Sequence, residues 1–256
     1  MFKVDRLGPL HLVLALLALG ILSLPLCLHA QQANQEAEIS AAEFYAKHID
    51  CGGIPVRSSS SVDDKALEIA CNKISMMLNN IPQIRANLVQ RGAELHIIGH
   101  SENTSDLPEF RSQRGVVYTD NTGKQTTIDL RTRGKGGLMS SCGEENILHL
   151  PGDRYGGGAD ICIHEFAHAI MDYGFNPAQR QLIKQQYAQS MSAGLWQNAY
   201  AATNPQEFWA ELSMWYFGAH GDRRMNGTPP ADGRDGLRSY DPNGFSLLEK
   251  LYNGYN

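Results

Sequence analysis

Apolar residues between positions 62 and 78 recur at intervals of three and four. This spacing places them on one face of a helix, which opens at Val62-Asp63-Asp64. Residues 81–90 repeat the spacing, and Gly92 is expected to end that second helix. A shorter helix is predicted for residues 41–48. The N-terminal half therefore contributes helices that each have one apolar face.

The central third of the chain has the short, partly alternating segments that are typical of strands. Turn residues separate these segments, including the serine run 58–61. The last two of them flank Asp120-Asn121-Thr122-Gly123-Lys124, which predicts a hairpin. The predicted strands cover residues 54–57, 94–98, 116–119 and 125–130.

A further strand is predicted at Asn146–Leu150, and a glycine-rich loop follows it at residues 151–158. This loop has neither the Lys-Ser/Thr ending nor the glycine spacing of a nucleotide-binding loop. We interpret it as a flexible approach to the next helix.

Beyond residue 159 the pattern is mainly helical, apart from a loop predicted at residues 222–243 from its Gly, Pro and Asp content. An order of helices, a small mixed sheet and more helices favours the α+β class. No internal repeat or long linker divides this part, so we expect one domain over residues 51–256 after a polar segment at 31–50. The predicted C-terminal helices cover residues 161–171, 178–192, 205–217 and 245–252.

The first thirty residues have the layout of an export signal. Lys3 and Arg6 give a basic start, residues 10–28 are almost entirely apolar, and a polar run begins after Ala30. The alternative is an uncleaved membrane anchor, because the apolar run approaches the roughly 20 residues of a spanning helix. Cleavage after Ala30 would give a secreted or periplasmic protein that is no longer attached to a membrane.

Charge excludes one class of partner. The predicted signal contains two basic residues and one acidic residue, so the remaining 226 residues carry 20 basic and 26 acidic side chains, a net charge of −6. No basic run is present that could follow a phosphate backbone, which argues against a nucleic-acid partner. The sequence does not set the oligomeric state.

Four cysteines remain after the predicted cleavage, and an even number in an exported chain indicates two disulfides. Proximity in sequence favours Cys51–Cys71 and Cys142–Cys162 among three possible connectivities. A zinc cluster would require short C-x-x-C spacings, which are absent. A third hypothesis is that Cys51 acts as a propeptide thiolate that covers a latent metal site.

The motif with the clearest chemistry is His164-Glu165-Phe166-Ala167-His168. Residues four apart lie on one face of a helix, so two imidazoles can reach one zinc ion. Glu165 lies beside them and can accept a proton from a water on the metal as that water attacks a carbonyl. The alternative is a pair of hydrogen-bonded core histidines, because the surrounding helix is apolar on several sides.

A catalytic zinc ion takes three protein ligands and keeps one position open. The metzincin extension would need glycine and histidine where the chain has Met171 and Gly174, so that class is excluded. An acidic residue on a later helix remains, and Glu207 and Glu211 share one face. Glu207 also stands where a capping-box glutamate would bond back to the N-cap Asn204. The residues alone leave ligation and capping equally open.

The histidine motif, together with Tyr-x-x-Thr-Asn-x-x-Glu-Phe-x-Ala-Glu at residues 200–211, resembles the catalytic domain of anthrax-lethal-factor-type zinc metallopeptidases. The match is specific over residues 160–217. The resemblance implies a zincin-like fold, Glu207 as the third zinc ligand and Glu211 as support behind the ligands. It also implies Tyr200 as the hydroxyl that stabilises the oxyanion. The toxin's helper domains are absent, so its substrate is not implied.

These observations predict a secreted zinc endopeptidase that binds one Zn²⁺ and acts on a peptide or protein. We expect the strand predicted at Asn146–Leu150 to bind an extended substrate by main-chain hydrogen bonds. Two alternatives stay open. One is a non-catalytic zinc-binding module on a zincin scaffold, and the other is a zinc amidase that acts on a cell-wall component.

Overall fold

The computed structural model describes residues 41–120 and 122–254. The chain divides into two compact units, Met1–Glu43 and Phe44–Asn256, and the second carries the motifs. The predicted export signal at residues 1–30 lies outside the described residues, as does most of the polar segment 31–50. Among the helices that are described, none is both long and apolar enough to cross a membrane.

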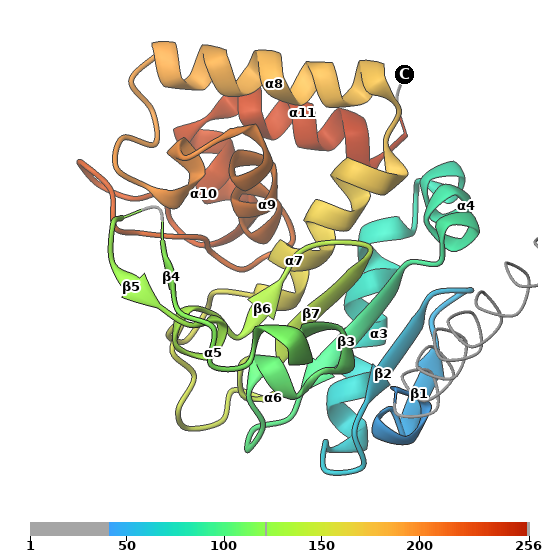
Figure 1. The fold of residues 1–256 in the computed structure, drawn as a ribbon. Coiled ribbons are helices and arrows are strands. Elements are labelled where there is room, and N and C mark those ends of the chain that lie inside the picture. Colours follow the sequence, from blue (N-terminus) through green and yellow to red (C-terminus); the bar gives the residue numbers. More distant parts are fainter. Residues whose placement is uncertain (1–40, 121, 255–256) are drawn as a thin grey trace, which may run out of the picture. The chain divides into compact units, whose positions relative to one another are not determined.

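A five-stranded mixed sheet forms one layer of the second unit (Figure 1). The three central strands are parallel, and the strand at each edge is antiparallel to its neighbour. The sheet begins before the domain boundary expected at residue 51. The helix predicted at 41–48 covers only residues 41–44. In spatial order the strands are β1 (Lys47–Asp50), β2 (Pro55–Ser58), β3 (Glu94–Ile98), β7 (Met139–Gly143) and β6 (Gly134–Lys135).

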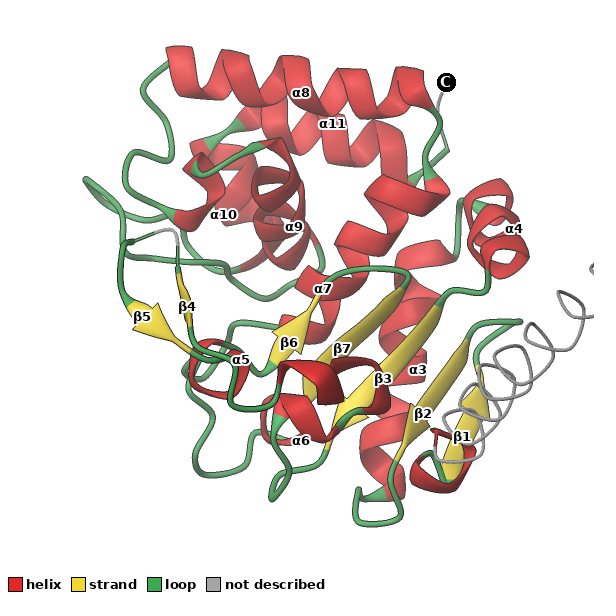
Figure 2. Cartoon of the chain, in the orientation of Figure 1, coloured by secondary structure: helices red, strands yellow, loops and turns green. Residues whose placement is uncertain are grey.

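Three of the helices predicted from the apolar spacing are present near this sheet. These are α3 (Asp64–Leu78), α4 (Pro82–Arg91) and α7 (Ile161–Ala169). The Asp63 side chain caps α3 by accepting the backbone N–H of Lys65, and Gly92 ends α4 in the left-handed conformation. Helix α3 packs against β2 and β3, and α7 packs against β7. Figure 2 shows both helices behind the strands.

A second group of helices completes the unit and surrounds α9 (Pro205–Tyr216). Every residue of α9 from Phe208 to Tyr216 is buried, so this helix forms the centre of the C-terminal core. Figure 1 shows α8 and α11 side by side along the outer edge of the group. With the sheet, this arrangement confirms the α+β prediction. The surrounding helices are α8 (Pro177–Ser192), α10 (Gly233–Tyr240) and α11 (Pro242–Tyr252).

Two of the predicted elements are wrong. Asn146–Leu150 is not a strand, because Glu144–Ile147 forms the short helix α6. The strand instead precedes it as β7, which the polar run Met139-Ser140-Ser141-Cys142-Gly143 builds by pairing with β3. The loop predicted at 222–243 contains α10, whose Leu237 is fully buried.

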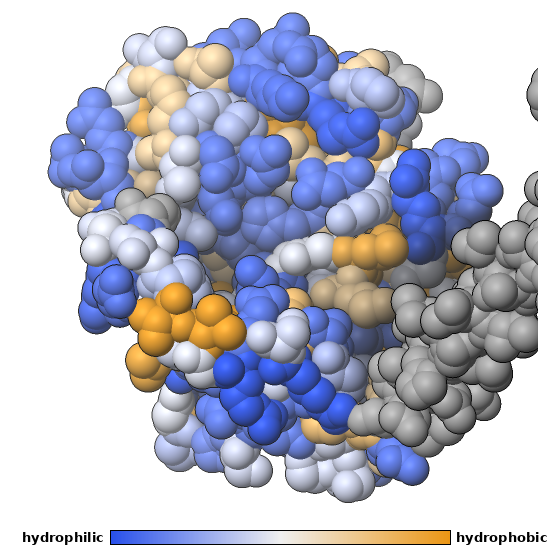
Figure 3. All heavy atoms as spheres, viewed as in Figure 1, coloured by the Kyte–Doolittle hydropathy of each residue, from blue (hydrophilic) through white to orange (hydrophobic). Residues whose placement is uncertain are grey.

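The predicted hairpin is also shorter than expected. It is formed by β4 (Tyr118–Thr119) and β5 (Gln125–Thr126), and α5 (Ile128–Arg131) follows directly. Large apolar side chains on either side of it are exposed, including Val117 and Leu130. Figure 3 shows the corresponding apolar surface over β5 and α5.

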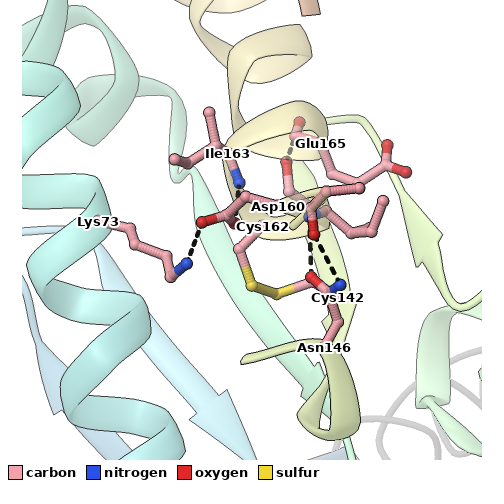
Figure 4. Close-up of a disulfide and its surroundings, with 10 residues drawn as sticks. Lys73, Cys142, Asn146, Asp160, Cys162, Ile163 and Glu165 are labelled. Carbon is pink, nitrogen blue, oxygen red and sulfur yellow. Dashed lines mark hydrogen bonds and ion pairs between the residues drawn. A yellow bond between two sulfur atoms is a disulfide. The ribbon is translucent and has the colours of Figure 1, made fainter. Parts of the chain in front are cut away.

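Both favoured disulfides are present. Cys51–Cys71 joins the β1–β2 turn to α3, and Cys142–Cys162 joins β7 to the first turn of α7. Figure 4 shows the second disulfide at the start of α7, with Glu165 extending to the other side of that helix. The cysteine pair therefore fixes the helix that carries the histidine motif to the sheet.

Removing either disulfide should cost similar stability. Both close loops with a sequence separation of 20, so each restricts the unfolded chain to the same extent. We expect the double alanine variants C51A/C71A and C142A/C162A each to lose about 2–4 kcal/mol of unfolding free energy. Denaturant unfolding measures this. A loss below about 1 kcal/mol in either variant would contradict the assignment of that disulfide as a stabilising link.

Candidate metal centre and active site

Helix α7 is held in place by contacts at its first turn and along one side. The carboxylate of Asp160 caps the helix by accepting the backbone N–H of Ile163 at 3.1 Å, and Lys73 forms an ion pair with the same carboxylate. On β7, the Ser140 hydroxyl donates to the backbone carbonyl of Glu165 at 3.1 Å. The motif is thus presented from a helix with little freedom to move.

Helix α9 is held against α7 and brings the second motif to the first. The indole Nε1 of Trp209 donates to the backbone carbonyl of Ala167 at 2.9 Å. At the start of α9, Asn204 Oδ1 accepts the backbone N–H of Glu207 at 2.8 Å. The backbone of Glu207 thus takes part in the helix cap, while its carboxylate is directed toward the two histidines. Among the described residues, the Glu207 side chain does not bond back to Asn204 as a capping box would require, and the cap comes from the Asn204 side chain.

Three donor atoms from these helices form a nearly equilateral triangle. Nε2 of His164 lies 3.3 Å from Nε2 of His168. Oε2 of Glu207 lies 3.2 Å from the first nitrogen and 3.4 Å from the second. Their side chains are 8%, 12% and 17% exposed, respectively. The triangle lies at the meeting point of α7 and α9.

The size of this triangle fits a zinc ion. Ligands at about 2.0–2.1 Å from a tetrahedral zinc lie about 3.3–3.4 Å from one another. Within the described part of the chain, the buried Oε2 of Glu207 makes no hydrogen bond of acceptable geometry. A buried carboxylate oxygen without such a partner is costly unless a cation neutralises it. Two imidazoles and one carboxylate are also a donor set that zinc commonly takes.

The charges around the triangle favour a positive ion. Burial lowers the pKa of His164, but its contacts with Glu207 and Glu211 outweigh burial and leave that pKa well above its usual value. Burial raises the pKa of Glu207, yet the two histidines hold it well below its usual range. Both shifts have the same cause, the attraction between the imidazoles and the neighbouring carboxylates. A cation between these groups meets the same electrostatic demand.

Glu211 and Tyr200 lie next to His164 on its other sides. Oε1 of Glu211, which is buried, lies 3.2 Å from Nδ1 of His164. The Tyr200 ring lies over the His164 ring, with 6.1 Å between centroids and 26° between planes. Burial raises the pKa of Tyr200 to about 12, so its hydroxyl remains a hydrogen-bond donor at neutral pH.

Glycines in and after β6 let that strand lie directly on the motif helix. A Cβ atom at Gly134 would come within 2.5 Å of Ile161 and 2.9 Å of the Glu165 carboxylate. A Cβ atom at Gly136 would come within 2.7 Å of the His168 ring. Any larger residue must therefore displace a motif side chain. Burial also raises the pKa of Glu165 in this enclosed position.

Replacing Gly136 by alanine should weaken zinc binding. The added methyl group pushes the His168 ring out of the donor triangle, and we expect a loss of zinc affinity of about 10–100-fold. Gly157→Ala is a matched control, because nothing lies within 4 Å of its added Cβ and its backbone needs no positive φ. Titration with zinc against a chelating indicator compares the two. Equal affinity in both variants would contradict the packing argument.

The fold thus brings together all six residues selected from the sequence. His164, Glu165, His168, Tyr200, Glu207 and Glu211 meet at one place. Sequence reasoning missed the β6 glycines, although the run Arg133-Gly134-Lys135-Gly136-Gly137 could have indicated a close backbone approach. It also missed Asp222, whose carboxylate accepts the backbone N–H of Tyr200 and which has no local sequence signal.

Comparison with known proteins supports the fold. No known protein-family model matches the chain, and no curated protein matches it in sequence. Among solved structures, the chain is similar to the Pro-Pro endopeptidase PPEP-2 from Paenibacillus alvei, with a TM-score of 0.55 and 18% sequence identity. The match covers 77% of this chain and 95% of that one. The chain therefore shares the fold of that solved structure, with a small mixed sheet packed on helices.

Proposed function

We propose that this protein is a zinc-dependent endopeptidase. The observation that carries the proposal is the triangle formed by His164, His168 and Glu207, whose edges of 3.2–3.4 Å fit one tetrahedral zinc ion. The triangle lies on a fold shared with a solved endopeptidase. In this assignment Glu207 is the third ligand, and Glu211 orients His164 through its contact with Nδ1, the ring nitrogen outside the donor triangle.

Each side chain of the site then has a distinct task. Zinc, when bound, lowers the pKa of water and polarises a peptide carbonyl. The Glu165 carboxylate accepts the proton of the attacking water and returns it to the leaving amine. The Glu165 carboxylate lies close to the backbone of Gly134 on β6. The Tyr200 hydroxyl donates a hydrogen bond to the carbonyl oxygen as that oxygen becomes negative.

The edge strand β6 is the best candidate for binding an extended substrate. Among the described strands it pairs only with β7, and it lies at the end of the sheet. Its residues Gly134 and Lys135 run beside Glu165, so a peptide added to the free edge would pass the motif helix. This corrects the expectation for Asn146–Leu150, which includes part of helix α6 and has no free strand edge to offer.

The finer assignments belong to the same proposal. The agreement of Tyr200, Glu207 and Glu211 with the geometry supports the anthrax-lethal-factor type suggested by their spacing. Two disulfides support action in an oxidising compartment, as expected for a secreted or periplasmic protein. We treat residues 51–256, preceded by β1, as one catalytic domain.

A chelator-controlled digest tests the proposal. The purified protein is incubated with a diverse peptide library that includes Pro-Pro sequences, because the similar solved enzyme is named for that cleavage. We expect internal cleavage that stops with chelator and returns with added zinc. Mass spectrometry identifies the bonds cut.

Other outcomes would overturn the assignment in defined ways. Stoichiometric zinc without cleavage of any peptide would favour a non-catalytic zinc-binding module. Chelator-sensitive release of fragments from peptidoglycan, with peptides untouched, would favour a cell-wall amidase. A protein without stoichiometric zinc would contradict the metal centre itself.

A further inference from the structure

The loop between α9 and α10 returns to the start of the short 3-10 helix Tyr200–Ala202. On this loop, Oδ2 of Asp222 accepts the backbone N–H of Tyr200 at 3.1 Å. The Asp222 side chain is only 14% exposed. Its second oxygen, Oδ1, accepts the backbone N–H of Arg224 at 3.0 Å and the Nε–H of the same residue at 2.8 Å. Both carboxylate oxygens are therefore occupied by donors.

The same residue also contacts the metal side of the site. The backbone N–H of Asp222 donates to Oε2 of Glu211 at 2.5 Å, while the other oxygen of Glu211 faces His164. This approach requires glycine at position 221, because a Cβ atom there would overlap Glu211 and Trp215. Asp222 thus lies between the carboxylate of Glu211 and the backbone of Tyr200.

The position of Tyr200 depends on how its short helix is held. The first N–H groups of any helix have no acceptor within the helix, and Asp222 supplies one for Tyr200. At the other end, the Tyr187 hydroxyl donates to the carbonyl of Ala202 at 2.8 Å. These two bonds anchor both ends of the short helix that carries the Tyr200 ring, which lies over His164.

We propose that Asp222 is a positioning residue for peptide hydrolysis. Its carboxylate holds the main chain of Tyr200, and its amide holds Glu211. The hydroxyl that stabilises the oxyanion and the imidazole that binds zinc are therefore kept at a fixed separation. This inference rests on the proposed function, because Tyr200 acts on the substrate and Asp222 acts through Tyr200.

Asp222→Asn is the direct test. An asparagine offers one oxygen and one NH2 group, so it cannot accept from both Tyr200 and Arg224, and one donor is left facing another. We expect kcat to fall about tenfold or more, because a small displacement of a catalytic group is costly. KM should change little, since the hydroxyl acts in the transition state. Zinc affinity should stay within about twofold, because the backbone bond to Glu211 remains.

A double variant separates this role from a structural one. Tyr200→Phe alone should lower kcat about 10²–10³-fold, the usual loss for one oxyanion donor. If Asp222 acts through Tyr200, adding Asp222→Asn to that variant should lower kcat no further. The proposal would be overturned if Asp222→Asn lowered kcat in the Tyr200→Phe background as much as it does in the wild type. It would also be overturned if Asp222→Asn lowered zinc affinity by the same factor as kcat. Arg224→Ala is the control, because it removes the 90% exposed guanidinium and leaves the contact with Tyr200.

A measurement on the unmodified protein keeps the test decisive if the Asp222 variant does not fold. Hydrogen exchange should show that the Tyr200 amide is protected in the wild type, although the first N–H groups of a helix have no acceptor within that helix. Exchange as fast as that of an exposed amide would overturn the proposal without any activity assay. A wild-type protein that cleaves no peptide would instead contradict the proposed function, while the exchange result would still report on Asp222.

Discussion

Glu165→Gln should abolish peptide cleavage while zinc remains bound. Glutamine has almost the same shape as glutamate but cannot accept the proton of the attacking water. Removing a general base of this kind lowers kcat by about 10²–10⁴-fold. The three donor atoms of the metal site belong to other residues, so zinc content should be unchanged. Cleavage rates and metal analysis on the same preparation measure both quantities.

Glu68→Gln provides the matched control for this experiment. Glu68 is exposed on α3, far in sequence from both motifs, and the substitution makes the same chemical change. Its activity should equal that of the wild type. Full activity in Glu165→Gln would remove the general base from the mechanism. Loss of zinc together with activity would show that Glu165 supports the metal centre instead.

Glu207→Gln should lose zinc itself. The neutral amide oxygen is a poor substitute for a carboxylate whose Oε2 lies 3.2 Å from one imidazole and 3.4 Å from the other. We expect zinc affinity to fall more than about 100-fold, beyond the usual effect of residues that only support ligands. Cleavage should fall in parallel. Thermal unfolding with and without zinc gives a second measure, because a bound ion raises Tm.

Asn204→Ala separates the capping of α9 from the proposed metal binding by Glu207. It removes the side chain that caps α9 but leaves the Glu207 carboxylate in place. We expect a loss of about 1 kcal/mol in stability with unchanged zinc affinity. If the Asn204 variant loses zinc and the Glu207 variant keeps it, then capping is the role of this segment and the ligand assignment is wrong.

The helix that carries the histidine motif, and the shared face of its two histidines, could be predicted from sequence because the information is local. Two histidines four residues apart must share a helix face, and the apolar residues around them indicate burial. The third ligand could not be settled this way. Glu207 fits a capping-box pattern and a ligand pattern equally well in sequence; in the fold its backbone N–H bonds to Asn204, while its carboxylate faces the two histidines.

The errors arose where distant contacts decide the structure. Strand β7 contains two serines, and its place comes from parallel pairing with β3 rather than from an apolar pattern. Helix α10 begins in a segment rich in glycine and aspartate, and burial of Leu237 stabilises it. Asp222 meets Tyr200 across 22 positions of sequence. Local propensity carries no information about such pairs.

The glycines in and after β6 also bear on which peptide sequences the proposed site would accept. Gly134 in β6 and Gly136 after it face the motif helix without side chains, so at these two positions only the backbone of the edge segment could contact a peptide laid along it. Residues of a peptide that face these positions should be widely interchangeable in a profiling experiment. Under the proposed function, discrimination among peptide sequences would come from other side chains around the site, such as Tyr200 beside His164.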